Sequence, residues 1–374
     1  MPNASYIHAM TELTQERIGR RLKWFRESRD LTQHALSAQL GFKDRQTMSD
    51  IEAGKRKVTP EELVAITTAL GVTLDEVLDP FQLVGEGGFS FRMENPKTDD
   101  LDAFTAKAGR WIATYRELGR QTGVEPAFLA FKLELTLESS FEDAAASAEA
   151  LRAHWGLGDV PAEELELAIE RQLGALVLYV DAPPGVSGAA SYLPGLPTIL
   201  INRHEPRSRR LFDLTHELFH VMTWHAMPPA RVESWEPSAT KGNRMEQLAN
   251  VFAASLLMPE AVVRSRWADR KDADPGEWML ATARALRVSP VALQWRLVNL
   301  GLLRKSQMLP LKGELPDPFA PPPPLFSVAF VARVHDAVED GRLSVRRAAA
   351  LLGLAVGEFA NLCRSYGRPL SYDA

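Results

Sequence analysis

Two histidines and a glutamate are spaced in this sequence as a metal site requires. His216, Glu217 and His220 form the pattern His-Glu-x-x-His within the run RRLFDLTHELFHVMTW. On a helix the two histidines lie one turn apart on the same face, so both imidazoles can reach a single tetrahedral zinc ion. Glu217 then lies beside the metal, where it is a candidate general base for a bound water. The pattern therefore predicts a zinc site on a helix.

A catalytic zinc site needs a third protein ligand. The segment after His220 lacks the glycine-containing extension that would bring a third histidine to the metal, and His225 would lie on the far side of a continued helix. We therefore expect a carboxylate from another element. Glu246, at the start of the helical pattern NRMEQLANVFAASLLMP, is the first candidate. The alternatives are Glu233, Glu236 and Glu260.

Other polar residues near the motif would assist the same chemistry. His225 or Tyr192 would serve to stabilise an oxyanion, although an ordinary structural role is the simpler interpretation of each. Asp213 and Asn250 are candidates to orient a ligating imidazole through a hydrogen bond. The residue types alone do not identify the group that stabilises the oxyanion.

The N-terminal part of the chain shows the pattern of a helix-turn-helix domain. Thr32 is suited to be an N-cap, Gly41 occupies the turn between the second and third helices, and Met48 and Ile51 are predicted to be buried. Apolar residues at helical spacing predict five helices, near residues 15–29, 32–39, 44–53, 60–70 and 73–78.

Charge and side-chain type in this part favour DNA as a partner. Between Glu16 and Val58, eleven Lys or Arg and six Asp or Glu give a local charge of +5, whereas the whole chain carries −5. Gln33, Lys55 and Arg56 are predicted to contact phosphates. Three side chains of the third helix are predicted to read base edges: Arg45, Gln46 and Ser49. The alternative is a helical bundle that contacts other proteins.

Composition limits the class of protein. A length of 374 residues predicts two or three domains. The single cysteine, Cys363, excludes internal disulfides and cysteine-rich zinc sites. No apolar run approaches the roughly 18 residues of a membrane span. We therefore expect a soluble cytoplasmic protein.

Between and beyond the two motifs the chain alternates linkers and helical patterns. Residues 85–88 (GEGG) indicate a flexible link, and helical patterns follow near 102–118 and 125–155. The apolar runs GALVLYVD and PTILIN predict two strands, separated by the turn-rich segment PPGVSGAASYLPG. Six prolines in residues 315–325 predict an extended linker. The segment LSVRRAAALLGLAVGEFANLCRSYG predicts a helical hairpin with Ser344 as its N-cap.

The predicted fold class is mainly α (α+β). A helix-turn-helix domain of five helices is followed by an α+β domain with a small sheet and the His-Glu-x-x-His helix, and then by a helical C-terminal segment. The expected divisions are a helix-turn-helix domain at 14–80, a linker and helical connector at 81–149, a zinc domain at 150–305, a proline-rich linker at 306–325, and a helical hairpin with a helix-turn-helix-like outline at 326–374.

Two segments resemble known families. LTQHALSAQLG, SDIEAGKRK and ALGVTLDEVL resemble the XRE family of phage-repressor-like DNA-binding domains. Residues 150–305, with Arg210 and Phe212 before the histidine motif and the run EQLANVFAASLLMP after it, resemble the ImmA/IrrE family of metallopeptidases. That resemblance implies a zincin-like fold. It also implies zinc bound by His216, His220 and Glu246, with Glu217 as the base.

Together the two resemblances imply a transcription regulator with a zinc-dependent endopeptidase domain. Its N-terminal domain would bind operator DNA as a homodimer, with half-sites about one helical turn apart. Its zinc domain would hydrolyse a repressor or another regulatory protein in response to stress or an inducing signal. The alternatives are a non-catalytic zinc-containing regulator that senses a ligand or partner, and an antitoxin-like binding module.

Overall fold

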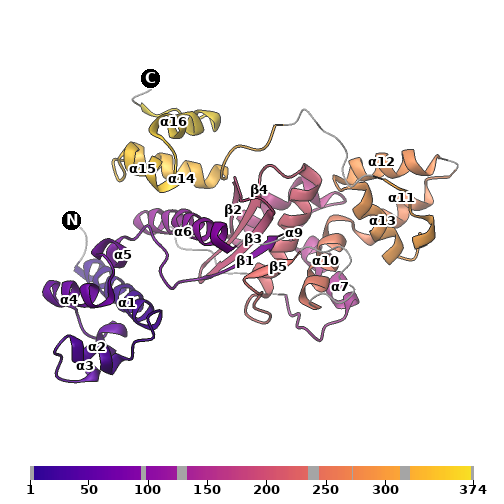
Figure 1. Cartoon of the computed structure of the whole chain (residues 1–374). Coiled ribbons are helices and arrows are strands. Elements are labelled where there is room, and N and C mark those ends of the chain that lie inside the picture. Colours follow the sequence, from indigo (N-terminus) through magenta and orange to yellow (C-terminus); the bar gives the residue numbers. More distant parts are fainter. Residues whose placement is uncertain are drawn as a thin grey trace. The chain divides into compact units, whose positions relative to one another are not determined.

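Two compact units make up the chain in this computed structural model. The first comprises Met1–Glu86 and Gly109–Glu117, and the second comprises Gly87–Ala108 and Leu118–Ala374. The described residues are 4–93, 98–123, 133–234, 244–271, 273–311 and 321–371. Helices dominate and a small sheet lies in the second unit (Figure 1), which confirms the predicted α+β class. No helix within the described ranges is long and apolar enough to cross a membrane.

The helices of the first unit begin where the sequence provides capping residues. Thr32 caps the second helix by accepting a hydrogen bond from the amide of Ala35, as predicted, and Asp44 caps the third in the same way. The first helix begins at Ala4, well before the start predicted near residue 15. The five helices are α1 (Ala4–Glu27), α2 (Gln33–Gln39), α3 (Arg45–Glu52), α4 (Pro60–Leu70) and α5 (Leu74–Leu78).

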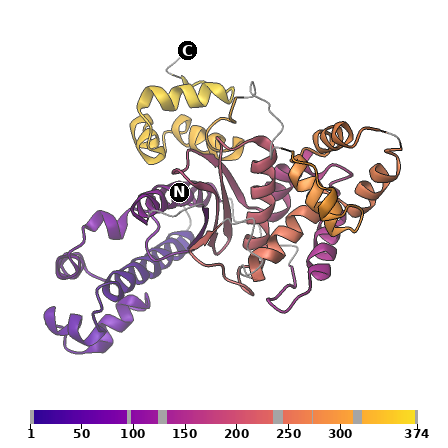
Figure 2. The ribbon, with the colours of Figure 1, turned by 45° about the vertical axis from the view of Figure 1, so that its right-hand side comes forward.

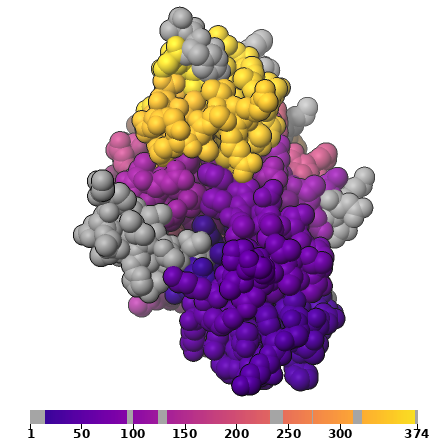
Figure 3. Space-filling view, turned by 90° about the vertical axis from the view of Figure 1, so that its left-hand side faces the viewer, coloured from indigo at the N-terminus to yellow at the C-terminus, as the bar shows by residue number. Residues whose placement is uncertain are grey.

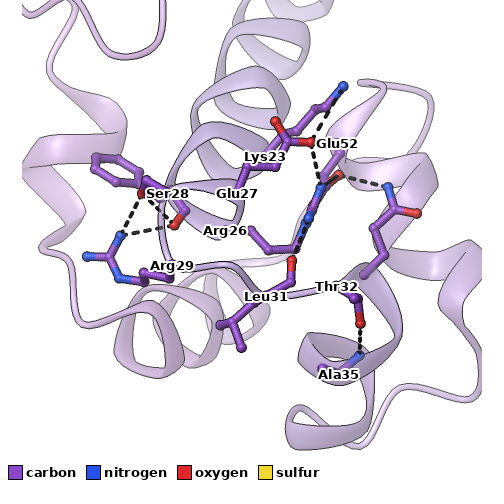
Figure 4. Close-up of polar contacts among 11 residues, drawn as sticks. Lys23, Arg26, Glu27, Ser28, Arg29, Leu31, Thr32, Ala35 and Glu52 are labelled. Atoms are coloured by element: carbon purple, nitrogen blue, oxygen red, sulfur yellow. Dashed lines mark hydrogen bonds and ion pairs between the residues drawn. The ribbon is translucent and has the colours of Figure 1, made fainter.

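Close packing of α1 on α3 holds this unit together. Met48 and Ile51 are buried, as predicted. Gly19 permits the close approach of the two helices, because a Cβ there would lie 2.3 Å from the carbonyl oxygen of Ile51. Arg26 of α1 reaches the buried carboxylate of Glu52 on α3, with Nε 2.6 Å from Oε1 (Figure 4). The helix-turn-helix is therefore fixed to its supporting helix by an apolar core and a buried ion pair.

A five-stranded mixed sheet forms the centre of the second unit. Its strand order is β2-β4-β3-β1-β5. The β1–β3 and β3–β4 pairs are antiparallel, whereas β2–β4 and β1–β5 are parallel. The strands are β1 (Gly88–Met93), β2 (Leu176–Val180), β3 (Val186–Leu193), β4 (Leu196–Asn202) and β5 (Val232–Ser234).

Two strands lie where the sequence predicted linking segments. Strand β3 occupies most of the stretch interpreted as turn-rich, and β1 directly follows the glycine-rich link. Both strands lie inside the sheet and are largely buried on both faces. In β3 the alternation of polar and apolar residues that marks a one-sided strand is weak. Pairing along β3 from Gly188 to Tyr192 makes β1 and β3 neighbours although they are far apart in sequence.

Helices cover the sheet and carry the motifs. Helix α9 packs on β3 and β4, and α10 packs on α9 and α7 (Figures 1 and 2). The helix predicted over 125–155 begins only at Phe141, after its N-cap Ser140; residues 125–132 of that prediction lie outside the described residues. The helices are α6 (Thr98–Gln121), α7 (Phe141–Trp155), α8 (Leu165–Ala168), α9 (Arg207–Thr223), α10 (Arg244–Leu257), α11 (Glu260–Ala268), α12 (Pro275–Leu286) and α13 (Pro290–Asn299), with short turns η1 (Pro161–Glu163), η2 (Ile169–Leu173) and η3 (Lys305–Gln307).

The C-terminal segment is a group of three short helices. They are α14 (Val328–Glu339), α15 (Val345–Leu352) and α16 (Val356–Ser365), which pack closely (yellow in Figure 3). Ser344 caps α15, as predicted, and Cys363 is buried. Residues 312–320 of the proline-rich linker lie outside the described residues.

Candidate metal centre and DNA-binding surface

Helix α9 carries the three residues of the His-Glu-x-x-His pattern into the interior. His216, Glu217 and His220 are each at most 1% exposed. The two imidazole rings lie 4.8 Å apart between centroids, as expected for positions one turn apart on a helix. Burial on this scale is rare for such polar groups unless they have polar partners. The partners come from α10 and from the sheet.

Glu246, in the first turn of α10, completes a cluster of three potential ligands. Its Oε2 lies 3.1 Å from Nε2 of His216, and its Oε1 lies 3.1 Å from Nε2 of His220. The two imidazole Nε2 atoms are 3.0 Å apart. Ligands at about 2.0–2.2 Å from a tetrahedral zinc ion lie about 3.3–3.6 Å from one another, so the cluster nearly matches that geometry. Among the described residues, these three side chains form a group whose ligand atoms all lie within 4.8 Å of one another, close enough to hold one metal ion.

Asn250 indicates why this cluster suits a cation. Its Oδ1 lies 3.1 Å from Nδ1 of His216, so that nitrogen donates its proton to the amide oxygen. In a neutral ring the lone pair of His216 then lies on Nε2 and faces an oxygen of Glu246. Two electron-rich atoms this close repel each other unless a positive charge lies between them. The donor set, two imidazoles and a carboxylate, is one that zinc accepts.

Electrostatics keep the first histidine neutral. Burial, together with the nearby guanidinium of Arg92, lowers the pKa of His216 to about 3. The ring is therefore uncharged near neutral pH and its lone pair is available to a metal.

Glu217 lies against the sheet, where a glycine makes room for it. A Cβ at Gly188 of β3 would lie 3.4 Å from Cγ of Glu217 and 3.5 Å from its Oε1. That Oε1 is buried and makes no hydrogen bond among the described residues. Burial raises the pKa of Glu217 well above its usual value, while Arg92 opposes the shift. A carboxylate so placed, beside the candidate metal ligands, suits a group that accepts and returns a proton.

Arg92 is the functional neighbour that sequence reasoning missed. It projects from β1 at 4% exposure, and its Nη1 lies 3.2 Å from Oδ1 of Asp213. Asp213 also lies 3.7 Å from Nε of Arg209. Asp213, which we expected to orient an imidazole, thus pairs with two arginines. The alternation in GFSFRM was the available signal for β1, but it follows a glycine-rich link.

Several remaining candidates make other contacts. Tyr192 Oη and His225 Nε2 share a hydrogen bond of 2.7 Å. Glu260 pairs with Arg264 at 2.6 Å on α11. The side chains of Glu233 and Glu236, the other two alternatives to Glu246 as third ligand, lie outside the described residues.

Helix α3 presents the predicted base-reading side chains. Arg45 and Gln46 are exposed and Ser49 is half-buried, so all three have access to solvent on the first turns of the helix. In the free protein Gln46 Nε2 donates to Oδ1 of Asp50 at 2.8 Å.

The three residues predicted to contact phosphates differ in whether their side chains are already bonded within the protein. Lys55 is exposed. Gln33 is half-buried and donates to Glu52 at 2.8 Å, so it joins α2 to the buried ion pair of α1 and α3. Arg56 makes a two-point contact with Glu62, at 2.7 and 3.1 Å. Gln33 and Arg56 are therefore engaged within the protein.

Comparison with known proteins agrees with this geometry. Residues 17–79 match the family model of a helix-turn-helix domain. Residues 170–298, which include all of α9 and α10, match the model of peptidase family M78, described as an IrrE N-terminal-like domain. The comparison with curated proteins gives no match. The chain therefore joins a helix-turn-helix domain to an IrrE N-terminal-like domain of peptidase family M78.

Proposed function

We propose that this protein is a DNA-binding transcription regulator whose second unit is a zinc-dependent endopeptidase. The observation that carries the proposal is the convergence of His216, His220 and Glu246, with Glu217 buried beside them. The substrate we propose is a repressor or another regulatory protein. Zinc, the cleaved protein and the operator belong to this proposal, as do the homodimer and the response to stress.

In the proposed mechanism, the residues of the site have separate roles in peptide hydrolysis. When bound, zinc supplies a Lewis acid that lowers the pKa of a water to about 7 and polarises a peptide carbonyl. Glu217 accepts the proton of the attacking water and delivers it to the leaving amine, so one carboxylate acts first as the base and then as the acid. Asn250 fixes the ring of His216 through its Nδ1 proton.

The peptidase proposal is tested with Glu217→Gln. Full-length protein loaded with zinc is incubated with repressors encoded near its gene, and fragments are identified by mass spectrometry. We expect wild type to cut one of them, and the variant to be slower by about 10²–10⁴-fold, the usual contribution of a general base. Glu260→Gln, at an exposed position on α11, is the matched control and should cut normally.

Metal content separates the possible outcomes. If Glu217→Gln retains about one zinc per chain and binds DNA, while neither form cuts any repressor, the peptidase proposal is wrong. The non-catalytic regulator and the antitoxin-like module would then be favoured.

The DNA-binding proposal rests on α3 and is tested separately. Arg45 and Gln46 expose donors at the start of the helix, as in direct readout of a major groove. Alanine at either position should weaken binding to the operator by about 1–3 kcal/mol and relax specificity at one base pair. Lys55→Ala should instead weaken all sequences alike and reduce the salt dependence. Unchanged affinity and salt dependence in all three variants would refute the proposal.

A further inference from the structure

A pocket of about 470 Å³ adjoins the metal centre of the second unit. It is lined from β1, α9, α10 and α13. Asn250, which faces His216, and Asp213, one turn before His216 on α9, both contribute to its wall. Its volume lies within the range of small-molecule sites, roughly 300–1,000 Å³. None of the roles assigned above uses this space.

The body of the pocket is apolar. Phe212, Val251, Val288 and Trp295 line it from three elements. Trp295 is 43% exposed, a large fraction for an indole ring. Aromatic and aliphatic walls of this kind bury the hydrocarbon part of a ligand, and their exposure in the free protein leaves that surface available.

The polar part of the wall is cationic. Arg92, Arg209 and Arg296 line the pocket together with a single carboxylate, Asp213. Arg92 and Arg209 share that carboxylate, and Arg209 also lies 3.6 Å from Glu205. The charges of these two arginines are therefore balanced within the protein.

Arg296 differs from the other two arginines. It is 5% exposed, and its Nε and Nη1 donate to neutral groups, the carbonyl of Met258 at 3.1 Å and the hydroxyl of Ser255 at 2.9 Å. Across the described ranges no carboxylate lies within ion-pair distance of it; Glu260 and Glu149 act on it only from farther away. A buried cation without a counter-ion is costly. An anion entering the pocket would lower that cost.

We propose that this pocket binds an apolar group that carries a carboxylate. The hydrocarbon part would lie against Trp295 and Val251, and the carboxylate would pair with Arg296. Two sources share this chemistry, an acidic and apolar segment of a polypeptide and a small organic acid. Binding at this site does not depend on the proposed peptidase activity.

The test uses N-acetylphenylalanine, with its neutral amide as the comparison. Titration calorimetry is done on the full chain stripped of metal with a chelator, so that the carboxylate cannot bind a metal ion. We expect the acid to bind at least tenfold more tightly than the amide, and Arg296→Gln to remove that difference. Arg264→Gln, an exposed arginine of α11 outside the pocket, is the control and should bind like wild type.

A second variant keeps the proposal testable if Arg296→Gln does not fold. Ala292→Phe fills the pocket from α13 without changing its charged groups, and we expect it to abolish binding. Equal binding of acid and amide, or unchanged binding by Ala292→Phe, would overturn the proposal. Glu217→Gln should bind N-acetylphenylalanine like wild type, so intact binding in a protein whose wild-type form cuts no repressor would count only against the peptidase.

A blocked peptide identifies the source of the ligand. Acetyl-Leu-Phe-Asp-Leu-amide carries its carboxylate on a side chain and has no free terminus. If it competes with N-acetylphenylalanine, the pocket accepts a polypeptide segment; if only the free acid binds, the ligand is a small organic acid. Either result supports the proposal, and failure of both probes to bind refutes it.

Discussion

Replacing Glu170 by glutamine should remove a pH dependence from the seam between the C-terminal helices and the sheet. Glu170 lies on η2, and its carboxyl group hydrogen-bonds Ser327, the N-cap of α14. The backbone amide of Phe326 donates to the carbonyl of Tyr179 on β2 at 2.7 Å, and Tyr366 donates to the carbonyl of Phe326 at 3.1 Å. This seam ties α14–α16 to strand β2.

The magnitude follows from the pKa of Glu170. Burial, together with the nearby carboxylate of Glu166, raises that pKa from 4.5 to about 7. A tenfold change in proton affinity equals about 1.4 kcal/mol, which sets an upper limit of about 3 kcal/mol. Because the side chain is only partly buried, solvent screening reduces this to about 2 kcal/mol.

The sign follows from linkage. The folded state holds the Glu170 proton more tightly than the unfolded state, so the stabilising contribution is complete below pH 4.5. It declines as the pH rises from 4.5 to about 7 and is lost above that value. Hydrogen exchange of the α14 backbone amides, corrected for intrinsic exchange rates, measures this stabilising contribution at pH 5 and pH 8.

At pH 8 the Glu170→Gln variant should protect α14 about thirtyfold better than wild type, and the difference should be much smaller at pH 5, where the wild-type contribution has only begun to decline. Glu164→Gln, at an exposed position nearby, is the matched control and should behave like wild type. Identical pH dependence in wild type and Glu170→Gln would refute the reasoning, because the titrating group would then lie elsewhere.

Three further predictions concern the two units. Glu246→Ala should reduce zinc, measured by elemental analysis, from about one per chain to a small fraction, and a value still near one would move the third ligand elsewhere. Gly19→Ala should destabilise the first unit by about 1–3 kcal/mol in chemical unfolding, because its Cβ would overlap the carbonyl of Ile51; an unchanged midpoint would contradict that packing. Arg92→Gln should lower the stability of the second unit by about 3 kcal/mol by leaving the buried Asp213 without its closest cation, and Arg92→Gln combined with Asp213→Asn should recover part of the loss.

The helical part of the site was predictable because its information is local. Residues three and four apart on a helix share a face whatever the rest of the chain does, so the spacing of His216 and His220 predicts a shared ligand position. The caps Thr32 and Ser344 were found for the same reason, since an N-cap acts within three residues. The position of Glu246 beside the histidines depends on the packing of α10 on α9. The sequence pattern offered Glu246 as one carboxylate among several, and the family resemblance implied it as the ligand.

The sheet side of the site was not predictable because its information is non-local. Arg92 reaches Asp213 only because β1 pairs with β3, which follows it by about a hundred residues. Strand β3 itself was hidden by its small residues, which are common in turns. Here those small residues have a steric role, because Gly188 leaves the space that Glu217 occupies. The same small residues that make β3 resemble a loop in the sequence therefore let the candidate base, Glu217, lie against the sheet. Local residue propensities mispredict this strand because the site requires small residues there.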